Sequence, residues 1–231
     1  MNLDHAILLD IEGTIGDIRF VRDVLFPYAR ARMNQTLFAH WNEPEVAHAV
    51  AQAREASGQP LDGAVAASDV FLSWMDEDKK ITPLKAIQGY IWREGYAQGE
   101  LKAHLYPDAN DAFSAWRSQG LKLYIYSSGS IEAQKLYLAH SIFGDVSAYF
   151  DGFFDTTTGP KQEPASYAAI ARHLDLPPRR VMFFSDMKPE ILAAKTAGMN
   201  AIRIDRSLEP QARANDSDSA VLGSFAPLLA H

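Results

Sequence analysis

Five short apolar segments recur along the 231-residue chain and constrain its fold more than any other feature of the sequence. The last four alternate with segments of helical period. Apolar strands that alternate with amphipathic helices are typical of a parallel β-sheet covered by helices on both faces. We therefore predict a doubly wound, Rossmann-like α/β fold with right-handed crossovers. The predicted strands are Ala6–Asp10, Leu121–Tyr126, Tyr149–Phe154, Val181–Phe184 and Ala201–Ile204.

The segment between the first two predicted strands has only helical periodicity, interrupted by Pro, Gly and Asp. We predict an all-helical domain here, inserted after the first strand as a cap over residues 17–105. The α/β catalytic core then comprises residues 1–16 and 106–231, in which the polar stretch Glu209–Ser219 is expected to be a loop. The predicted helices of the insertion are Val24–Ala39, Pro44–Ser57, Ala66–Glu77 and Pro83–Gln98.

Two carboxylates, Asp10 and Glu12, follow the first predicted strand and point to the same side if the chain is still extended there. One carboxylate of such a pair can bind a hard cation and attack an electrophile, while the other transfers protons to or from the leaving group. Gly13 allows the backbone to turn sharply after them. Taken alone, the motif is explained equally well by two acids that solvate a loop.

Polar residues also follow two later strands, and the carboxyl ends of parallel strands meet at one edge of a sheet. Ser127, Ser128 and Gly129 precede a helix, so their hydroxyl and N–H groups can bind a phosphate, although a serine N-cap explains them as well. Asp186 follows the fourth strand. It is either an ordinary helix cap or, opposite Asp10, a second carboxylate ligand of Mg²⁺.

Lys161 lies in a turn, Gly159–Pro164, between the third predicted strand and the next helix. A lysine on a loop is more commonly solvent-exposed, but this one can also supply a fixed positive charge. The order aspartate, serine, lysine, aspartate after successive sheet elements resembles the haloacid dehalogenase superfamily. That resemblance implies a phosphatase with an aspartate nucleophile.

Glu12 stands where the usual first motif of that superfamily, Asp-x-Asp-Gly-Thr, has its second aspartate. With this substitution, the chain resembles the enolase-phosphatases of methionine salvage over nearly its whole length. The segments that carry this resemblance are Asp23–Arg30, Ile81–Tyr96, Leu123–Ser141 and Tyr149–Tyr167.

The resemblance implies a bifunctional reaction, in which 2,3-diketo-5-methylthiopentyl 1-phosphate is enolised and dephosphorylated to 1,2-dihydroxy-3-keto-5-methylthiopentene. Magnesium is the implied cofactor, held by Asp10, Asp186 and the backbone carbonyl of Glu12. Asp10, Glu12 and Lys161 are the implied catalytic residues. The implied phosphoryl site consists of Ser127, Ser128, Gly129 and Lys161. The chain departs from the family at Ile15-Gly16, where further threonines are common, and this affects the expected fine specificity.

The composition of the chain excludes some kinds of chemistry and argues against some kinds of partner. The absence of cysteine excludes disulfides and thiolate chemistry, and a net charge of −7 argues against binding to a nucleic-acid backbone. No apolar run approaches the ~20 residues of a membrane span, so we expect a cytoplasmic protein with a small phosphate ester as its partner, and by default a monomer.

A related phosphatase acting on phosphoglycolate or a sugar phosphate remains an alternative function, as does, more distantly, a non-catalytic binding module. Glu12 and Asp186 disfavour a dehalogenase, which needs neither an acid for a leaving oxygen nor magnesium.

Overall fold

The structure is a computed structural model that describes residues 6–215 and 219–229. The chain divides into two compact units, one formed by the chain up to Ile18 and from Ala103 onward, the other by Arg19–Lys102. In the part of the chain that is described, no helix has the length and apolar character needed to cross a lipid bilayer.

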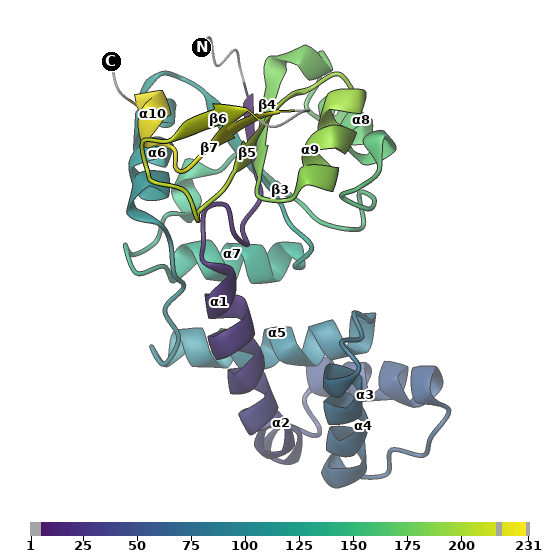
Figure 1. The fold of residues 1–231 in the computed structure, drawn as a ribbon. Helices are drawn as coiled ribbons and strands as arrows, with labels where there is room; N and C mark the ends of the chain where they lie inside the picture. The colour runs from purple at the N-terminus through teal and green to yellow at the C-terminus, as the bar shows by residue number, and fades with distance from the viewer. Residues whose placement is uncertain (1–5, 216–218, 230–231) are drawn as a thin grey trace. The chain divides into compact units, whose positions relative to one another are not determined.

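The first unit contains a seven-stranded sheet in the order β3-β2-β1-β4-β5-β7-β6. Figure 1 draws the strands of this sheet as arrows among the helices of the unit. All neighbouring strands are parallel except β6 and β7, which are antiparallel. The prediction of a doubly wound, mostly parallel sheet is confirmed. The strands are β1 (Ala6–Leu9), β2 (Lys122–Tyr126), β3 (Gly152–Phe154), β4 (Val181–Ser185), β5 (Asn200–Ile204), β6 (Arg213–Asn215) and β7 (Ala220–Leu222).

Helices cover both faces of this sheet (Figure 1). On one face, the side chains of α8 and α9 pack against Leu8 and Phe183. On the other, Trp116 of α6 stacks on Phe184 at 5.8 Å between ring centroids and meets Phe225 edge to face. Because both faces are buried, β1 is apolar at every position. The helices are α6 (Pro107–Ser118), α7 (Ile131–Ala139), α8 (Pro164–His173), α9 (Lys188–Thr196) and α10 (Ala226–Leu229), with short 3-10 turns at Ser147–Tyr149 and Pro178–Arg180.

Two predictions about the sheet are wrong in detail. The third strand begins at Gly152 rather than Tyr149, because the rings of Tyr149 and Phe150 turn away to pack on Phe113 of α6. The expected loop Glu209–Ser219 contains β6, an edge strand with every residue exposed, which lacks the apolar alternation that signals a strand. Residues 216–218 of that stretch lie outside the described part of the chain.

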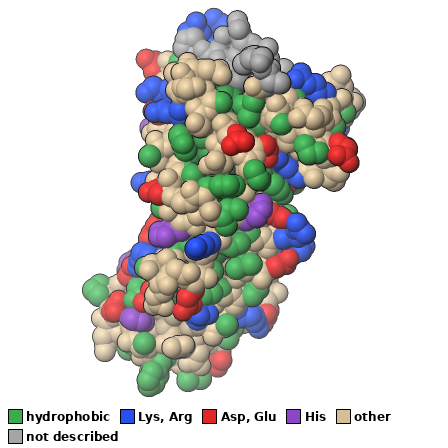
Figure 2. Space-filling view, turned by 90° about the vertical axis from the view of Figure 1, so that its left-hand side faces the viewer, with side chains coloured by type: hydrophobic (Ala, Val, Ile, Leu, Met, Phe, Trp, Pro, Cys, Tyr) green, Lys and Arg blue, Asp and Glu red, His purple; other side chains and the backbone are tan. Residues whose placement is uncertain are grey.

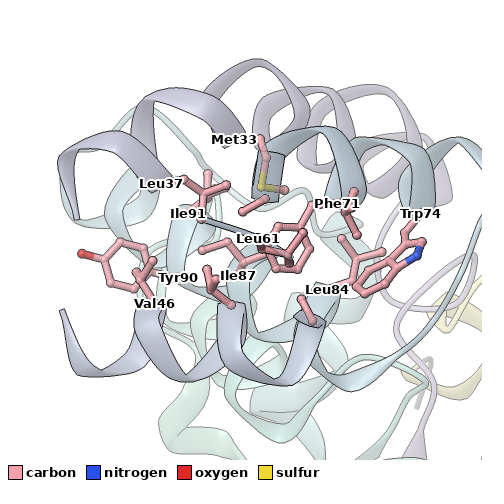
Figure 3. Close-up of a cluster of buried hydrophobic side chains, with 14 of the residues drawn as sticks. Met33, Leu37, Val46, Leu61, Phe71, Trp74, Leu84, Ile87, Tyr90 and Ile91 are labelled. Carbon is pink, nitrogen blue, oxygen red and sulfur yellow. The ribbon is translucent and has the colours of Figure 1, made fainter. Parts of the chain in front are cut away.

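The second unit is all-helical, with its own buried core (Figure 3). Met33 and Leu37 of α2 pack with Phe71 and Trp74 of α4 and with Ile87 of α5. The first helix of this unit begins at Ile18 rather than at the predicted Val24, and it includes a π-helical turn. At the end of that turn, the Leu25 carbonyl accepts a hydrogen bond from the indole N–H of Trp92 at 2.8 Å. The elements are α1 (Ile18–Phe20), whose first residue belongs to the first unit, η1 (Val21–Leu25), α2 (Phe26–Ala39), α3 (Pro44–Ser57), α4 (Ala64–Asp76) and α5 (Thr82–Ala97).

Charged side chains of both signs are interspersed on the face of the molecule drawn in Figure 2. Short ion pairs form at the surface of the second unit, such as Arg93 with Glu45 at 2.6 Å and Arg30 with Asp76 at 2.7 Å. Exposed pairs of this kind contribute little to stability, about 0–1 kcal/mol each.

Candidate active site

The carboxyl ends of the central strands carry the polar residues singled out in the sequence. β1 lies at the point where the sheet order reverses, with β2 on one side and β4 on the other. In open α/β sheets, ligands bind in the crevice outside such a point. Asp10 follows β1, Ser127 follows β2 and Asp186 follows β4, so all three lie at this edge.

Asp10 is buried and paired with Lys161, whose Nζ lies 2.5 Å from Asp10 Oδ1. The same Nζ lies 2.8 Å from Glu190 Oε2, and the three side chains are at most 10% exposed. Burial disfavours the charged ammonium, but the carboxylates of Asp10 and Glu190 outweigh it and raise the pKa of Lys161. Lys161 is therefore a fixed cation at the end of β1.

The loop that carries Lys161 is held by two tyrosines. Tyr126 donates its hydroxyl proton to the Gly159 carbonyl at 2.9 Å, and Tyr167 donates to the carbonyl of Lys161 itself at 2.7 Å. Tyr126 ends β2, and Tyr167 lies in the first turns of α8. The position of the Lys161 loop is thus set by the end of β2 and by α8, the helix that follows the loop.

Glu12 faces the end of β2. Its carboxylate accepts a hydrogen bond from Ser127 Oγ at 3.0 Å. Burial, and after it the charge of Asp10, raise the pKa of Glu12. A carboxyl group with a raised pKa can hold a proton and release it to a substrate, as a general acid must.

Asp186 lies against the turn that follows β1. A Cβ at position 13 would collide with the Asp186 carboxylate, so the approach of the two segments requires glycine there, where φ is +76°. The backbone N–H of Asp186 donates to Thr14 Oγ1 at 3.0 Å, and the Thr14 hydroxyl is 3.5 Å from Asp10 Oδ2. These contacts fix Asp186 beside Asp10.

The Asp186 carboxylate is incompletely satisfied. Its Oδ1 atom is buried and has no hydrogen-bond partner within the described residues. Burial, and then the charge of Asp10, raise the pKa of Asp186 to about 6. Two adjacent carboxylates with an orphaned oxygen are what a hard divalent cation would satisfy, because Mg²⁺ prefers oxygen ligands.

Within the described ranges, no group of three or more His, Asp or Glu side chains is arranged to hold a metal. The predicted magnesium set does not require one, since it combines the carboxylates of Asp10 and Asp186 with a backbone carbonyl, that of Glu12. The donor chemistry of these residues therefore fits Mg²⁺.

The loop after β2, residues 127–129, is held in place by hydrogen bonds. Ser127 Oγ accepts the Gly129 N–H at 3.2 Å, and Ser128 beside it is exposed. Gln134 of α7 donates from Nε2 to the Gly129 carbonyl at 2.8 Å and to the Phe154 carbonyl at 2.9 Å. The loop thus leads into the N-terminus of α7, where backbone N–H groups favour an anion.

Contacts and strand ends thus bring the predicted residues together: Lys161 meets Asp10, Ser127 meets Glu12, and Asp186 meets the turn after Asp10. Sequence reasoning missed the contact of Glu190 with Lys161. A signal for it exists, because Glu190 follows the strand-end Asp186 by four residues and lies in the first turn of α9. Burial and the charge of Asp10 raise the pKa of Glu190 to about 7.

Comparisons with known proteins agree on one family. Residues 5–198 match the family of haloacid dehalogenase-like hydrolases. Proteins named enolase-phosphatase E1 from Parvibaculum lavamentivorans and Pseudomonas aeruginosa are 48% and 49% identical to the chain, over 92% and 87% of its length and 90% and 89% of theirs. The protein of the same name from Aquifex aeolicus is 46% identical over 89% of this chain and 92% of its own.

Solved structures show the same fold. The UTR4 protein of Saccharomyces cerevisiae superposes with a TM-score of 0.82 at 31% identity, covering 96% of this chain and 98% of that one. CbbY from Rhodobacter sphaeroides, solved in complex with phosphate, has a TM-score of 0.59 at 20% identity, covering 97% of this chain and 96% of its own. That second likeness concerns the fold alone.

Proposed function

Because the chain belongs to the enolase-phosphatase E1 family of the haloacid dehalogenase-like hydrolases, we propose that it converts 2,3-diketo-5-methylthiopentyl 1-phosphate to 1,2-dihydroxy-3-keto-5-methylthiopentene and phosphate in methionine salvage. The observation that carries the proposal is the buried Asp10, paired with Lys161 and placed beside Asp186 with its unsatisfied oxygen. A nucleophile, a fixed cation and an oxygen-rich metal position are the parts that phosphoryl transfer requires.

In the phosphatase step, the Asp10 carboxylate attacks phosphorus, and the bond from phosphorus to the ester oxygen breaks. The product of this step is an aspartyl-phosphate and a leaving oxygen that needs a proton. Glu12, whose pKa is raised by burial and by Asp10, donates that proton. As the conjugate base, Glu12 then takes a proton from the water that hydrolyses the aspartyl-phosphate and regenerates Asp10.

Positive charge must surround this reaction, because an anionic nucleophile repels an anionic phosphate. Lys161 supplies one charge from its fixed position against Asp10. Asp10, Asp186 and the backbone carbonyl of Glu12 would hold Mg²⁺, which supplies further positive charge at the phosphoryl oxygens when bound. Ser127 and Ser128, the N–H of Gly129 and the Lys161 ammonium are the groups that we assign to phosphoryl binding.

The enolisation step moves a proton between a carbon and a carbonyl oxygen. We assign this transfer to Glu12, because its side chain is one methylene longer than the aspartate usual in the superfamily and can therefore reach further into the site. The helical segment 17–105 is proposed as a cap that supplies contacts for the methylthio end of the substrate. We further propose a cytoplasmic monomer that acts on a free small molecule, which is supported by the acidic, cysteine-free composition.

The test is to incubate the purified protein and Mg²⁺ with the diketo phosphate, and to follow phosphate release and the ultraviolet absorbance of the enediol product together. Both signals should rise with the wild type and vanish with Asp10→Asn. Asp151→Asn is the matched control, because Asp151 is paired with Arg117 at 2.6 Å before β3, at the amino end of the sheet, and this variant should keep both signals.

Two results would contradict the proposal. Phosphate release from generic esters or phosphoglycolate, with none from the diketo phosphate, would assign the chain to another substrate of the superfamily. Undiminished phosphate release by Asp10→Asn would remove Asp10 as the nucleophile.

A further inference from the structure

Arg206 contacts the turn that follows β1 and Asp10, but the phosphatase mechanism proposed above does not use it. It follows β5, and its side chain is only 12% exposed. Its guanidinium lies over the ring of Tyr106 at 4.0 Å and faces the ring of Phe225 at 5.2 Å. Burying a charge is costly unless the charge is paired and hydrogen-bonded, so the partners of this guanidinium show what it holds in place.

The guanidinium bridges two segments that are far apart in the sequence. Its Nη1 donates to both carboxylate oxygens of Asp108, at 2.9 and 2.8 Å. Its Nε donates to the backbone carbonyl of Thr14 at 2.9 Å, and Nη2 donates to the same carbonyl. Asp108 is held in turn by the backbone N–H of Phe225 at 2.7 Å. The Thr14 carbonyl is therefore held by two N–H groups of one planar guanidinium, which Asp108 keeps in position.

Thr14 connects the two carboxylates of the site. Its hydroxyl accepts the Asp186 N–H at 3.0 Å and lies 3.5 Å from Asp10 Oδ2, and the residue is fully buried. A shift of the Thr14 backbone therefore moves both contacts at once. Misplacement by about 1 Å at a catalytic group can cost on the order of 10²-fold in rate.

We propose that Arg206 is a positioning residue for the phosphatase reaction: by anchoring the Thr14 carbonyl to Asp108, it holds the Thr14 hydroxyl between Asp10 and Asp186 and so sets the separation of these two carboxylates. The inference rests on the proposed function, because it assigns Asp10 the role of nucleophile and both carboxylates the role of magnesium ligands. It adds a residue from the β5 end of the sheet to a site otherwise built from β1 to β4.

A comparison of variants at two arginines, Arg206 and Arg117, distinguishes a positioning role from a purely structural one. Arg117 forms a related but weaker bridge at the amino end of the sheet, where Nη1 alone contacts Asp151 at 2.6 Å and the Leu121 carbonyl at 3.3 Å. Arg117→Met therefore removes an arginine that also joins a carboxylate to a backbone carbonyl, without touching the Thr14 turn. Arg206→Met and Arg206→Lys are the test variants, and lysine keeps the charge without the planar fork that bridges both partners.

Three quantities are measured for each variant: kcat and KM, the Mg²⁺ concentration for half-maximal activity, and the rise in Tm caused by Mg²⁺ without substrate. For Arg206→Met we expect kcat to fall about 10–100-fold and the half-maximal Mg²⁺ concentration to rise by a similar factor, the usual effect of losing a residue that orients metal ligands. The Mg²⁺-induced rise in Tm should shrink accordingly. Arg206→Lys should fall between wild type and Arg206→Met, and Arg117→Met should lose stability only.

The proposal is overturned if Arg206→Met loses stability but keeps the kcat and the Mg²⁺ response of Arg117→Met. If Arg206→Met does not fold, Arg206→Lys is judged by the same two criteria. A wild-type protein that binds Mg²⁺ and hydrolyses a generic phosphate ester, but not the diketo phosphate, overturns the proposed function alone. The comparison of arginine variants is then made on the generic ester.

Discussion

Replacement of Lys161 by methionine tests how the charges of the site are balanced. The Lys161 ammonium lies 2.5 Å from Asp10 Oδ1 and 2.8 Å from Glu190 Oε2, in a buried environment. At an effective dielectric constant of about 20, each of these contacts corresponds to about 6 kcal/mol of attraction. Desolvation of the charges offsets much of this, and removal of one partner from a buried ion pair costs about 3–5 kcal/mol because the remaining charge is uncompensated. We expect that loss in the unfolding free energy of Lys161→Met at pH 8.

The same loss should depend on pH, because Glu190 can become neutral. The folded-state pKa of Glu190 is raised from 4.5 to about 7, so the folded protein binds more protons than the unfolded chain between these values. The contribution of Glu190 to stability therefore decreases as the pH rises through this window. The charge of Lys161 lowers the pKa of Glu190. Removing Lys161 therefore raises this pKa further and extends to higher pH the range in which the folded protein binds the extra proton. The deficit of Lys161→Met should shrink from pH 8 to pH 6.

The assay is urea unfolding without Mg²⁺ at both pH values. Adding Glu190→Gln to Lys161→Met should restore more than half of the lost stability at pH 8, since it removes one uncompensated carboxylate. Lys122→Met is the matched control, because Lys122 pairs with Asp151 at 3.5 Å while 62% exposed, and it should change stability by less than about 1 kcal/mol. A loss below about 1 kcal/mol for Lys161→Met at pH 8, or an equal loss at pH 6, would refute the reasoning.

Two further substitutions test the proton donor and the phosphate loop. Glu12→Asp should lower the rate of enolisation more than that of phosphate release, in a single-turnover assay that follows both, because the shorter side chain cannot reach the substrate carbon. Equal rates for wild type and variant in both steps would remove Glu12 from the enolisation. Gln134→Met should raise the inhibition constant of inorganic phosphate about tenfold or less, because it removes hydrogen bonds of 2.8 and 2.9 Å that brace the Gly129 and Phe154 carbonyls. Leu138→Val, on the same helix, is its control for altered packing, and an inhibition constant changed equally in both variants would show that Gln134 acts only through helix stability.

The central sheet was predictable because its strands are buried on both faces. Ile7 and Leu9 face one layer of helices and Leu8 the other, so β1 has no polar position and reads as a continuous apolar run. The edge strand β6 carries Arg213 and Asn215 and is exposed throughout, so nothing in its sequence distinguished it from a loop. Its pairing with β7 is a tertiary fact that no local pattern encodes.

The candidate site was predictable to the extent that it follows strand ends. Asp10, Ser127 and Asp186 each come directly after a strand or within one residue of its end, and a parallel sheet places such residues at one edge. Lys161 emerged from its place in the order of motifs rather than from its local sequence. Arg206 had no signal of either kind, because it acts on a carbonyl 192 residues earlier in the chain.

The charge balance of the site explains why these residues depend on one another. Among the described residues at this edge, the carboxyl groups of Asp10, Glu12, Asp186 and Glu190 lie around the ammonium of Lys161, and burial raises the pKa of the last three acids. Lys161 offsets part of the negative charge by contacting Asp10 and Glu190, whereas Asp186 has a buried oxygen without a partner among the described residues. A divalent cation at that oxygen would complete the balance and allow an anionic phosphate to approach. The separation of Asp10 and Asp186 then decides how well the cation is held, and the turn that sets this separation is the one that Arg206 anchors.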